Sequence, residues 1–112
     1  MSLIAVDQMI EFAVATLATG ERRKMASLVR ELASGWPEEK AQAVCFALTS
    51  AASIVEDVST TTDRSTPPSF GYKLSALVAA DIYAIESLGR FPALGRDLLH
   101  FWRRVDPYFL DQ

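Results

Sequence analysis

The stretch "KLSALVAADIYAIESLG", residues 73–89, decides the fold because its apolar residues recur at the spacing of one helical face. At about 100° per residue they fall into a single stripe. The stripe contains Leu74, Leu77, Val78, Ile85 and Leu88. Asp81 lies in its centre, where an ionised carboxylate needs a partner if it is buried. The stretch therefore predicts an amphipathic helix with one acid on its apolar side.

The rest of the chain has similar periodicity, and no run alternates for long enough to predict a strand. Glycines and prolines separate the apolar-faced segments, as is typical of helix ends. The predicted helices cover residues 3–18, 21–34, about 37–57, about 71–88 and a segment between 92 and 105. We expect a single all-α domain over residues 1–112, a five-helix bundle-like fold whose first two helices form an antiparallel hairpin through Gly20.

Prolines mark two further features of the predicted domain. Pro37, followed by Glu38 and Glu39, suits the first turn of a helix, where a missing N–H is harmless and acids are favoured. We therefore expect the third helix to begin there. Residues 58–70, "VSTTTDRSTPPSF", carry hydroxyl groups and two prolines, and they predict a long polar loop between the third and fourth helices, either mobile or a binding loop.

The composition limits the classes of partner. The 112 residues carry a net charge of -3 with a pI near 5.0, which argues against sequence-independent binding to nucleic acid or to an anionic membrane. No apolar run approaches the about 20 residues that span a bilayer. The single cysteine, Cys45, excludes an internal disulfide. We expect a cytoplasmic protein with no membrane segment.

Two groups of apolar side chains predict contact with a second chain. In the first predicted helix, Met9 and Phe12 project nearly opposite the main apolar stripe. After the last helix, residues 106–112 form an apolar C-terminal tail that contains Tyr108, Phe109 and Leu110. We expect a homodimer that buries these five side chains. The alternative is that the first helix is covered on two sides within one domain and that the tail docks back on it.

The third predicted helix is rich in alanine and serine. Small side chains let another helix approach closely. The sequence does not separate a tight crossing inside the domain from a seam between two copies.

The last predicted helix carries a basic stripe. Arg96, His100 and Arg103 align at i, i+4 and i+7, and Arg90 lies near them. The stripe predicts a site for an anion or an acidic partner. The aromatic residues of this helix lie on its other side, so they are not placed to stack on bases. The alternative is a solvated face that is balanced by Asp97 and by acids of neighbouring helices.

DNA recognition and catalysis find little support. Residues 25–46 have a helix-turn-helix outline, but the second helix begins "PEEKAQAV". It presents acids and small residues where a DNA-binding recognition helix presents arginine, asparagine or glutamine to the bases. The chain has one histidine, no glycine-rich phosphate loop and no Gly-x-Ser-x-Gly motif. Cysteine pairs and Glu-x-x-His pairs are also missing. We expect no enzymatic activity, cofactor or metal site.

Asp81 is expected to be buried and paired. We predict an arginine of the second or last helix as its partner, with Trp36, Trp102, another aromatic donor or backbone amides as alternatives. An arginine would lower the pKa of this carboxyl group, so acid would destabilise the fold. The competing interpretation places Asp81 in a groove, in contact with a ligand.

These features predict a non-catalytic regulatory or adaptor protein that binds another macromolecule through a helical face, with the basic stripe as the contact. The alternative is a helical pocket protein that binds a small anionic ligand between the last two helices.

Overall fold

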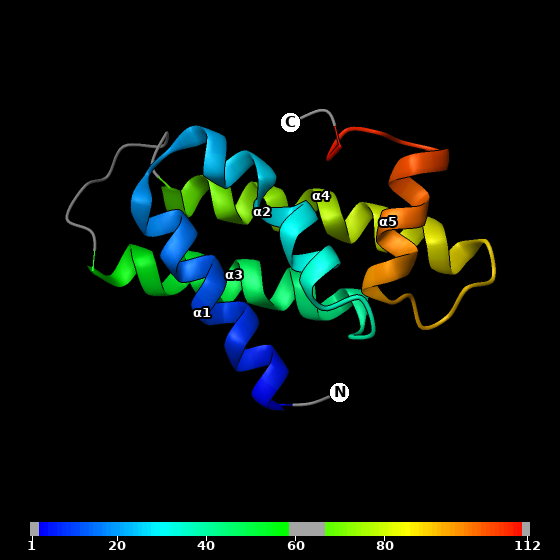
Figure 1. Ribbon diagram of the computed structural model, residues 1–112, viewed down its shortest axis with the longest axis horizontal. Helices are drawn as coiled ribbons and strands as arrows, with labels where there is room; N and C mark the ends of the chain where they lie inside the picture. Colours follow the sequence, from blue (N-terminus) through cyan, green and yellow to red (C-terminus); the bar gives the residue numbers. More distant parts are fainter. Residues whose placement is uncertain (1–2, 59–66, 111–112) are drawn as a thin grey trace.

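A computed structural model of the protein describes residues 3–58 and 67–110, and these form five helices with no strand among them (Figure 1). The helices are α1 (Leu3–Thr19), α2 (Arg22–Gly35), α3 (Ala41–Val58), α4 (Pro67–Ser87) and α5 (Gly95–Arg104). The prediction of an all-α fold with five helices is confirmed. Within the described residues, no helix has the length and apolarity required to cross a bilayer.

The helices form two layers. α3 and α4 pack together over most of their lengths, and α1, α2 and α5 lie in front of them (Figure 1). α1 and α2 contact each other on either side of a turn at Gly20, whose φ of 67° suits glycine. The antiparallel geometry of this pair stays a prediction. The core lies between the layers and draws on all five helices.

Small residues bring α3 and α4 close together. A Cβ atom added to Gly71 would lie 3.0 Å from the Cβ atom of Ala52 and 3.1 Å from a methyl group of Leu17. Nearby, the Ser75 hydroxyl donates to the Cys45 carbonyl over 3.1 Å, and it lies 2.8 Å from the Thr49 hydroxyl. One side of α3 therefore forms the tight crossing within the domain that its small residues allow.

The predicted start of the third helix is wrong. α3 begins at Ala41, and residues 37–40 form turns that pair with the start of α5 instead. The Gly95 N–H donates to the Glu39 carbonyl over 2.8 Å, and the Arg96 N–H donates to the Pro37 carbonyl over 2.9 Å. Because these carbonyls accept bonds from α5, tertiary pairing overrides the local preference for a helix at Pro37.

The fourth helix begins earlier than predicted, at Pro67 rather than near Gly71. Both prolines of the polar segment lie in the first turn of α4, where their missing N–H groups would have no partner in the helix. The remaining part of the predicted mobile loop, residues 59–66, lies outside the described residues.

The expected interface residues are mostly covered within the chain. Met9 and Phe109 are fully buried, so neither is available to a second copy, and that part of the prediction is wrong. Phe12 is half-buried, with its ring 6.1 Å from that of Trp36. Leu110 is half-buried against the core, and only Tyr108 is exposed. The physical reason is the alternative stated above: α1 is covered on two sides, and the described part of the tail docks on the domain.

Candidate functional site

Asp97 organises the turn between α4 and α5. α4 ends at Ser87, two residues before Gly89, whose φ of 106° lets the chain reverse. The Asp97 carboxylate then accepts a hydrogen bond from the Leu94 N–H over 2.8 Å, which satisfies one free donor at the start of α5. The same carboxylate lies 3.1 Å and 3.2 Å from the Nε atom of Arg90. Asp97 thus fixes both the helix start and the arginine of the turn.

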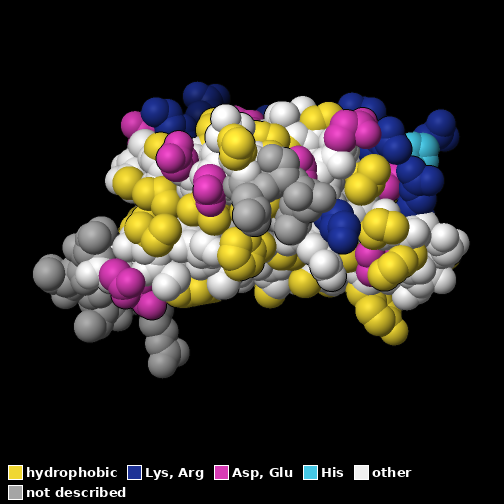
Figure 2. Space-filling view, turned by 90° about the horizontal axis from the view of Figure 1, so that it is seen from below, with side chains coloured by type: hydrophobic (Ala, Val, Ile, Leu, Met, Phe, Trp, Pro, Cys, Tyr) yellow, Lys and Arg dark blue, Asp and Glu magenta, His cyan; other side chains and the backbone are white. Residues whose placement is uncertain are grey.

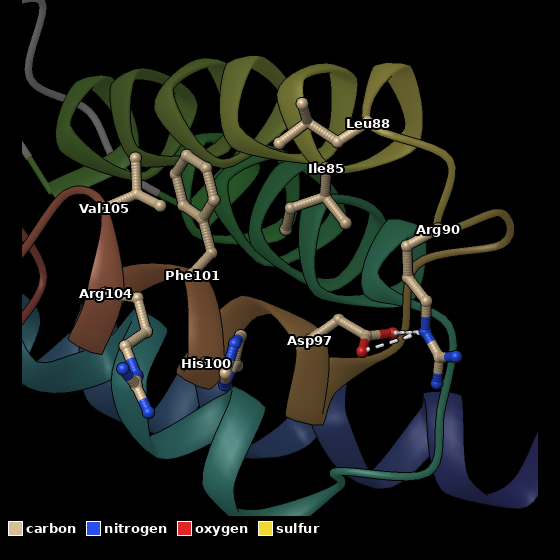
Figure 3. Close-up of a pocket in the computed structure, with 8 residues that line it drawn as sticks. All are labelled: Ile85, Leu88, Arg90, Asp97, His100, Phe101, Arg104 and Val105. Carbon is tan, nitrogen blue, oxygen red and sulfur yellow. Dashed lines mark hydrogen bonds and ion pairs between the residues drawn. The ribbon is translucent and has the colours of Figure 1, made fainter.

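A groove of about 330 Å³ lies between α4 and α5 (Figure 3). Its floor is apolar and consists of Ile85 on α4 and Phe101 on α5 with Leu88 and Val105, which directly follow the ends of these two helices. Leu88 is 80 % exposed and Val105 is 64 % exposed, so the floor is open to solvent. We call this hollow the α4–α5 groove.

Polar side chains border the α4–α5 groove. His100 and Arg104 lie one helical turn apart along α5, and the Arg90–Asp97 ion pair lies at one end (Figure 3). His100 and Arg104 have no described acidic side chain within ion-pair distance. The groove therefore combines an open apolar floor with positive charge at its edge.

The structure divides the predicted basic stripe. Arg90 forms an ion pair with Asp97, and Arg96 lies 3.2 Å from a carboxylate oxygen of Glu38. We expected both arginines to be available to a partner, but each is balanced by an acid, as the stated alternative has it. Arg103 is exposed on α5 but lies outside the groove lining. Figure 2 shows Lys and Arg side chains gathered around the single histidine at one end of the molecule. The basic group available to a partner is His100, Arg103 and Arg104.

The sequence prediction missed the apolar part of the site. Leu88 belongs to the apolar stripe predicted for residues 73–89, and Val105 likewise continues the apolar periodicity of the last helix. Both lie at helix ends, beyond the point where a neighbouring helix covers them. Their terminal position was the available signal, because the last turn of a helix often extends past its packing partner.

Asp81 is half-buried and accepts a hydrogen bond from the Trp102 indole over 2.9 Å. The partner is therefore a tryptophan, one of the stated alternatives, and the prediction of an arginine is wrong. The arginines of α5 leave the helix on other sides from Trp102, which is fully buried. Asp81 does not line the α4–α5 groove. It positions α4 against α5 and belongs to the packing of the domain.

The Asp81–Trp102 pair reverses the expected pH dependence. Burial raises the pKa of Asp81 and the nearby charge of Asp106 raises it further, although the Trp102 hydrogen bond opposes both effects. A raised pKa in the folded state means that the contribution of Asp81 to stability is fully present below its unfolded pKa, about 4. That contribution is lost as the pH rises through the folded pKa.

The variant Asp81→Asn tests this sign. It keeps an oxygen acceptor for the indole and removes the titrating charge, so its stability relative to the wild type should increase as the pH rises from about 3 to 7. Urea unfolding of both proteins across this range measures the difference. A fall in the stability of Asp81→Asn relative to the wild type as the pH rises would contradict the raised pKa.

Nucleophilic and metal chemistry find no support in the described residues. Burial raises the pKa of Cys45 to about 11, even though its hydrogen bond to Ser75 acts in the opposite direction. The thiol is therefore protonated at neutral pH and is a weak nucleophile. Across residues 3–58 and 67–110, no three His, Cys, Asp or Glu side chains gather in a way that could hold a metal ion.

The chain matches no family model, no curated protein and no solved structure. The geometry of the α4–α5 groove is thus the basis for a functional inference.

Proposed function

We propose that the protein is a small cytoplasmic, non-catalytic adaptor, acting as a homodimer, that binds an acidic amphipathic segment of a partner protein in the α4–α5 groove. The observation that carries the proposal is the open floor of Leu88 and Val105 beside His100 and Arg104, which pair with no acid among the described residues. An amphipathic helix inserts apolar side chains into such a groove. Carboxylates on its flank would meet the basic edge.

Two features favour a protein segment over nucleic acid. The floor is aliphatic at its exposed positions, and its one aromatic residue, Phe101, is buried, so the groove itself offers no exposed ring to stack on bases. The chain also carries a net charge of -3, so a long polyanion that reached past the basic end of the molecule would be repelled. A short acidic segment needs only a few cations, and Arg103 and Arg104 are exposed near the end of α5.

A small anionic amphiphile is the second candidate for the same groove. Its support is the volume of about 330 Å³, which lies near the lower end of the range for ligand sites, about 300–1,000 Å³. In this case the apolar part of the ligand would contact the floor, and its head group would face Arg104.

The test is a selection of peptides from a displayed helical library, followed by titration of the selected peptides. We expect peptides with carboxylates beside apolar residues at i and i+4, and we expect their binding to weaken with salt. Leu88→Glu should weaken binding about tenfold or more, because it places a negative charge on the apolar floor.

The matched control is Ile4→Glu, which changes an apolar residue that is 73 % exposed on α1, outside the groove. It should bind the peptides like the wild type. Equal binding by Leu88→Glu and Ile4→Glu would remove the groove from the function. Binding of decanoate in the groove, without any bound peptide, would replace the adaptor with the small-ligand candidate.

A further inference from the structure

The side of α3 and α4 that faces away from α1, α2 and α5 is exposed to solvent and has no charge over its central part. We call it the α3–α4 outer face. Its exposed residues are Gln42, Phe46, Thr49 and Ser53 on α3 and Ala76, Ala79, Ala80 and Tyr83 on α4. Phe46 is 57 % exposed and Tyr83 is 77 % exposed, so two large aromatic side chains project from a surface of mostly small, uncharged side chains.

The lack of charge on this face is a property of the sequence. Residues 41–55 contain no Asp, Glu, Lys or Arg. On α4, the only charged residue between Lys73 and Glu86 is Asp81, and its carboxylate is bonded to Trp102 on the other side of the helix. A helix face that remains in water normally carries charged side chains. A neutral face on two adjacent helices is the pattern of a covered surface.

The two ends of the face carry charges of both signs. Lys40 and Glu86 line one hollow at one end. At the other end, Lys73 on α4 lies next to Tyr72, whose hydroxyl donates to the Glu56 carboxylate on α3 over 3.3 Å. Each end therefore carries one base and one acid. When two such faces pack together, either end of one face can place its base near an acid of the other face.

We propose that the α3–α4 outer face is the interface between two copies of this chain. This inference rests on the homodimer proposed above and names its interface. In a two-fold symmetric contact, residues near the axis meet their own copies, so a charged residue there would face a like charge. The neutral centre avoids that repulsion, and the mixed ends provide complementary pairs.

The size of the face is of the order that a dimer needs, once the relief of its side chains adds to its flat outline. Residues 41–55 extend for about 22 Å at about 1.5 Å per residue, and two packed helices are about 20 Å across. This outline corresponds to several hundred Å², before the relief of Phe46 and Tyr83 is counted. A standard interface takes about 800 Å² of accessible surface from each partner.

Sedimentation velocity over a wide range of protein concentration tests the interface. The wild type should sediment as a dimer of a 12.3 kDa chain. Phe46→Glu and Tyr83→Glu should each weaken the dimer about 100-fold or more, because the symmetric contact buries two carboxylates without partners. Both side chains are exposed on their own helices, so the monomers should keep their helical circular dichroism.

Leu88→Glu is the matched control, since it changes an apolar residue that is 80 % exposed directly after α4 but lies in the α4–α5 groove. It should remain dimeric. A dimer that survives both Phe46→Glu and Tyr83→Glu would overturn this interface while leaving the homodimer in place. A wild type that is monomeric at every concentration would overturn both proposals and indicate that a different protein covers the face. Peptide binding by the monomeric variants reports separately on the groove.

Discussion

Trp102→Ala should lower the free energy of unfolding by about 3–5 kcal/mol, the range for removing a large aromatic side chain from a core. Trp102 is fully buried, and its ring centre lies 5.0 Å from that of Phe109. The substitution would leave a cavity beneath the C-terminal tail and would remove the indole donor of Asp81. Urea unfolding followed by circular dichroism measures the effect.

Two further variants separate the contributions of Trp102. Trp102→Phe keeps most of the apolar volume but removes the N–H group, so it should lower stability by about 1–2 kcal/mol through the lost hydrogen bond and the smaller ring. Trp36→Ala is the matched control, because Trp36 is only half-buried and should lose less than Trp102→Ala. Equal losses for the two alanine variants would contradict the central place of Trp102 in the core.

Much of this core could be predicted from hydrophobic periodicity. The apolar stripe predicted for residues 73–89 correctly marked Leu74 and Val78 as buried, because they lie in the middle of α4. Leu88 follows the same periodicity but is exposed, so its predicted place in the buried stripe is wrong. Periodicity reports the direction of a side chain, but the length of the neighbouring helix decides whether anything covers it. In the α4–α5 groove, neither Leu88 nor Val105 is covered by a neighbouring element.

Partners across the fold were harder to predict than faces. The sequence showed that Asp81 needed a donor, and both arginine and tryptophan were chemically suitable. The choice depended on the rotation of α5, which turns Trp102 toward α4 and its arginines outward. Pro37 shows the same limit, because its helix-start signal is local and the carbonyls of residues 37 and 39 bond to the backbone of α5.

Gly95→Ala should lower the free energy of unfolding by about 2–3 kcal/mol, at the upper end of the range for overpacking. A Cβ atom on Gly95 would lie 2.7 Å from the Trp36 carbonyl oxygen and 3.1 Å from the Ala33 carbonyl oxygen. These are backbone atoms of the last turn of α2 and of the residue that follows it, and they cannot rotate away. Relief of the clash therefore requires the start of α5 to move, against the bond from the Gly95 N–H to the Glu39 carbonyl.

Gly35→Ala provides the control for this prediction. The two variants make the same chemical change, but a Cβ atom on Gly35 has no atom within 4 Å. Because alanine also restricts the unfolded chain, Gly35→Ala should be neutral or stabilising by about 0.5 kcal/mol. Similar stabilities for the two variants would contradict the close approach at Gly95.

The displacement of α5 has a second consequence, since the Asp97–Arg90 pair and the floor residue Phe101 move with it. Gly95→Ala should therefore also weaken peptide binding in the α4–α5 groove under conditions in which the protein is still folded, whereas Gly35→Ala should bind like the wild type.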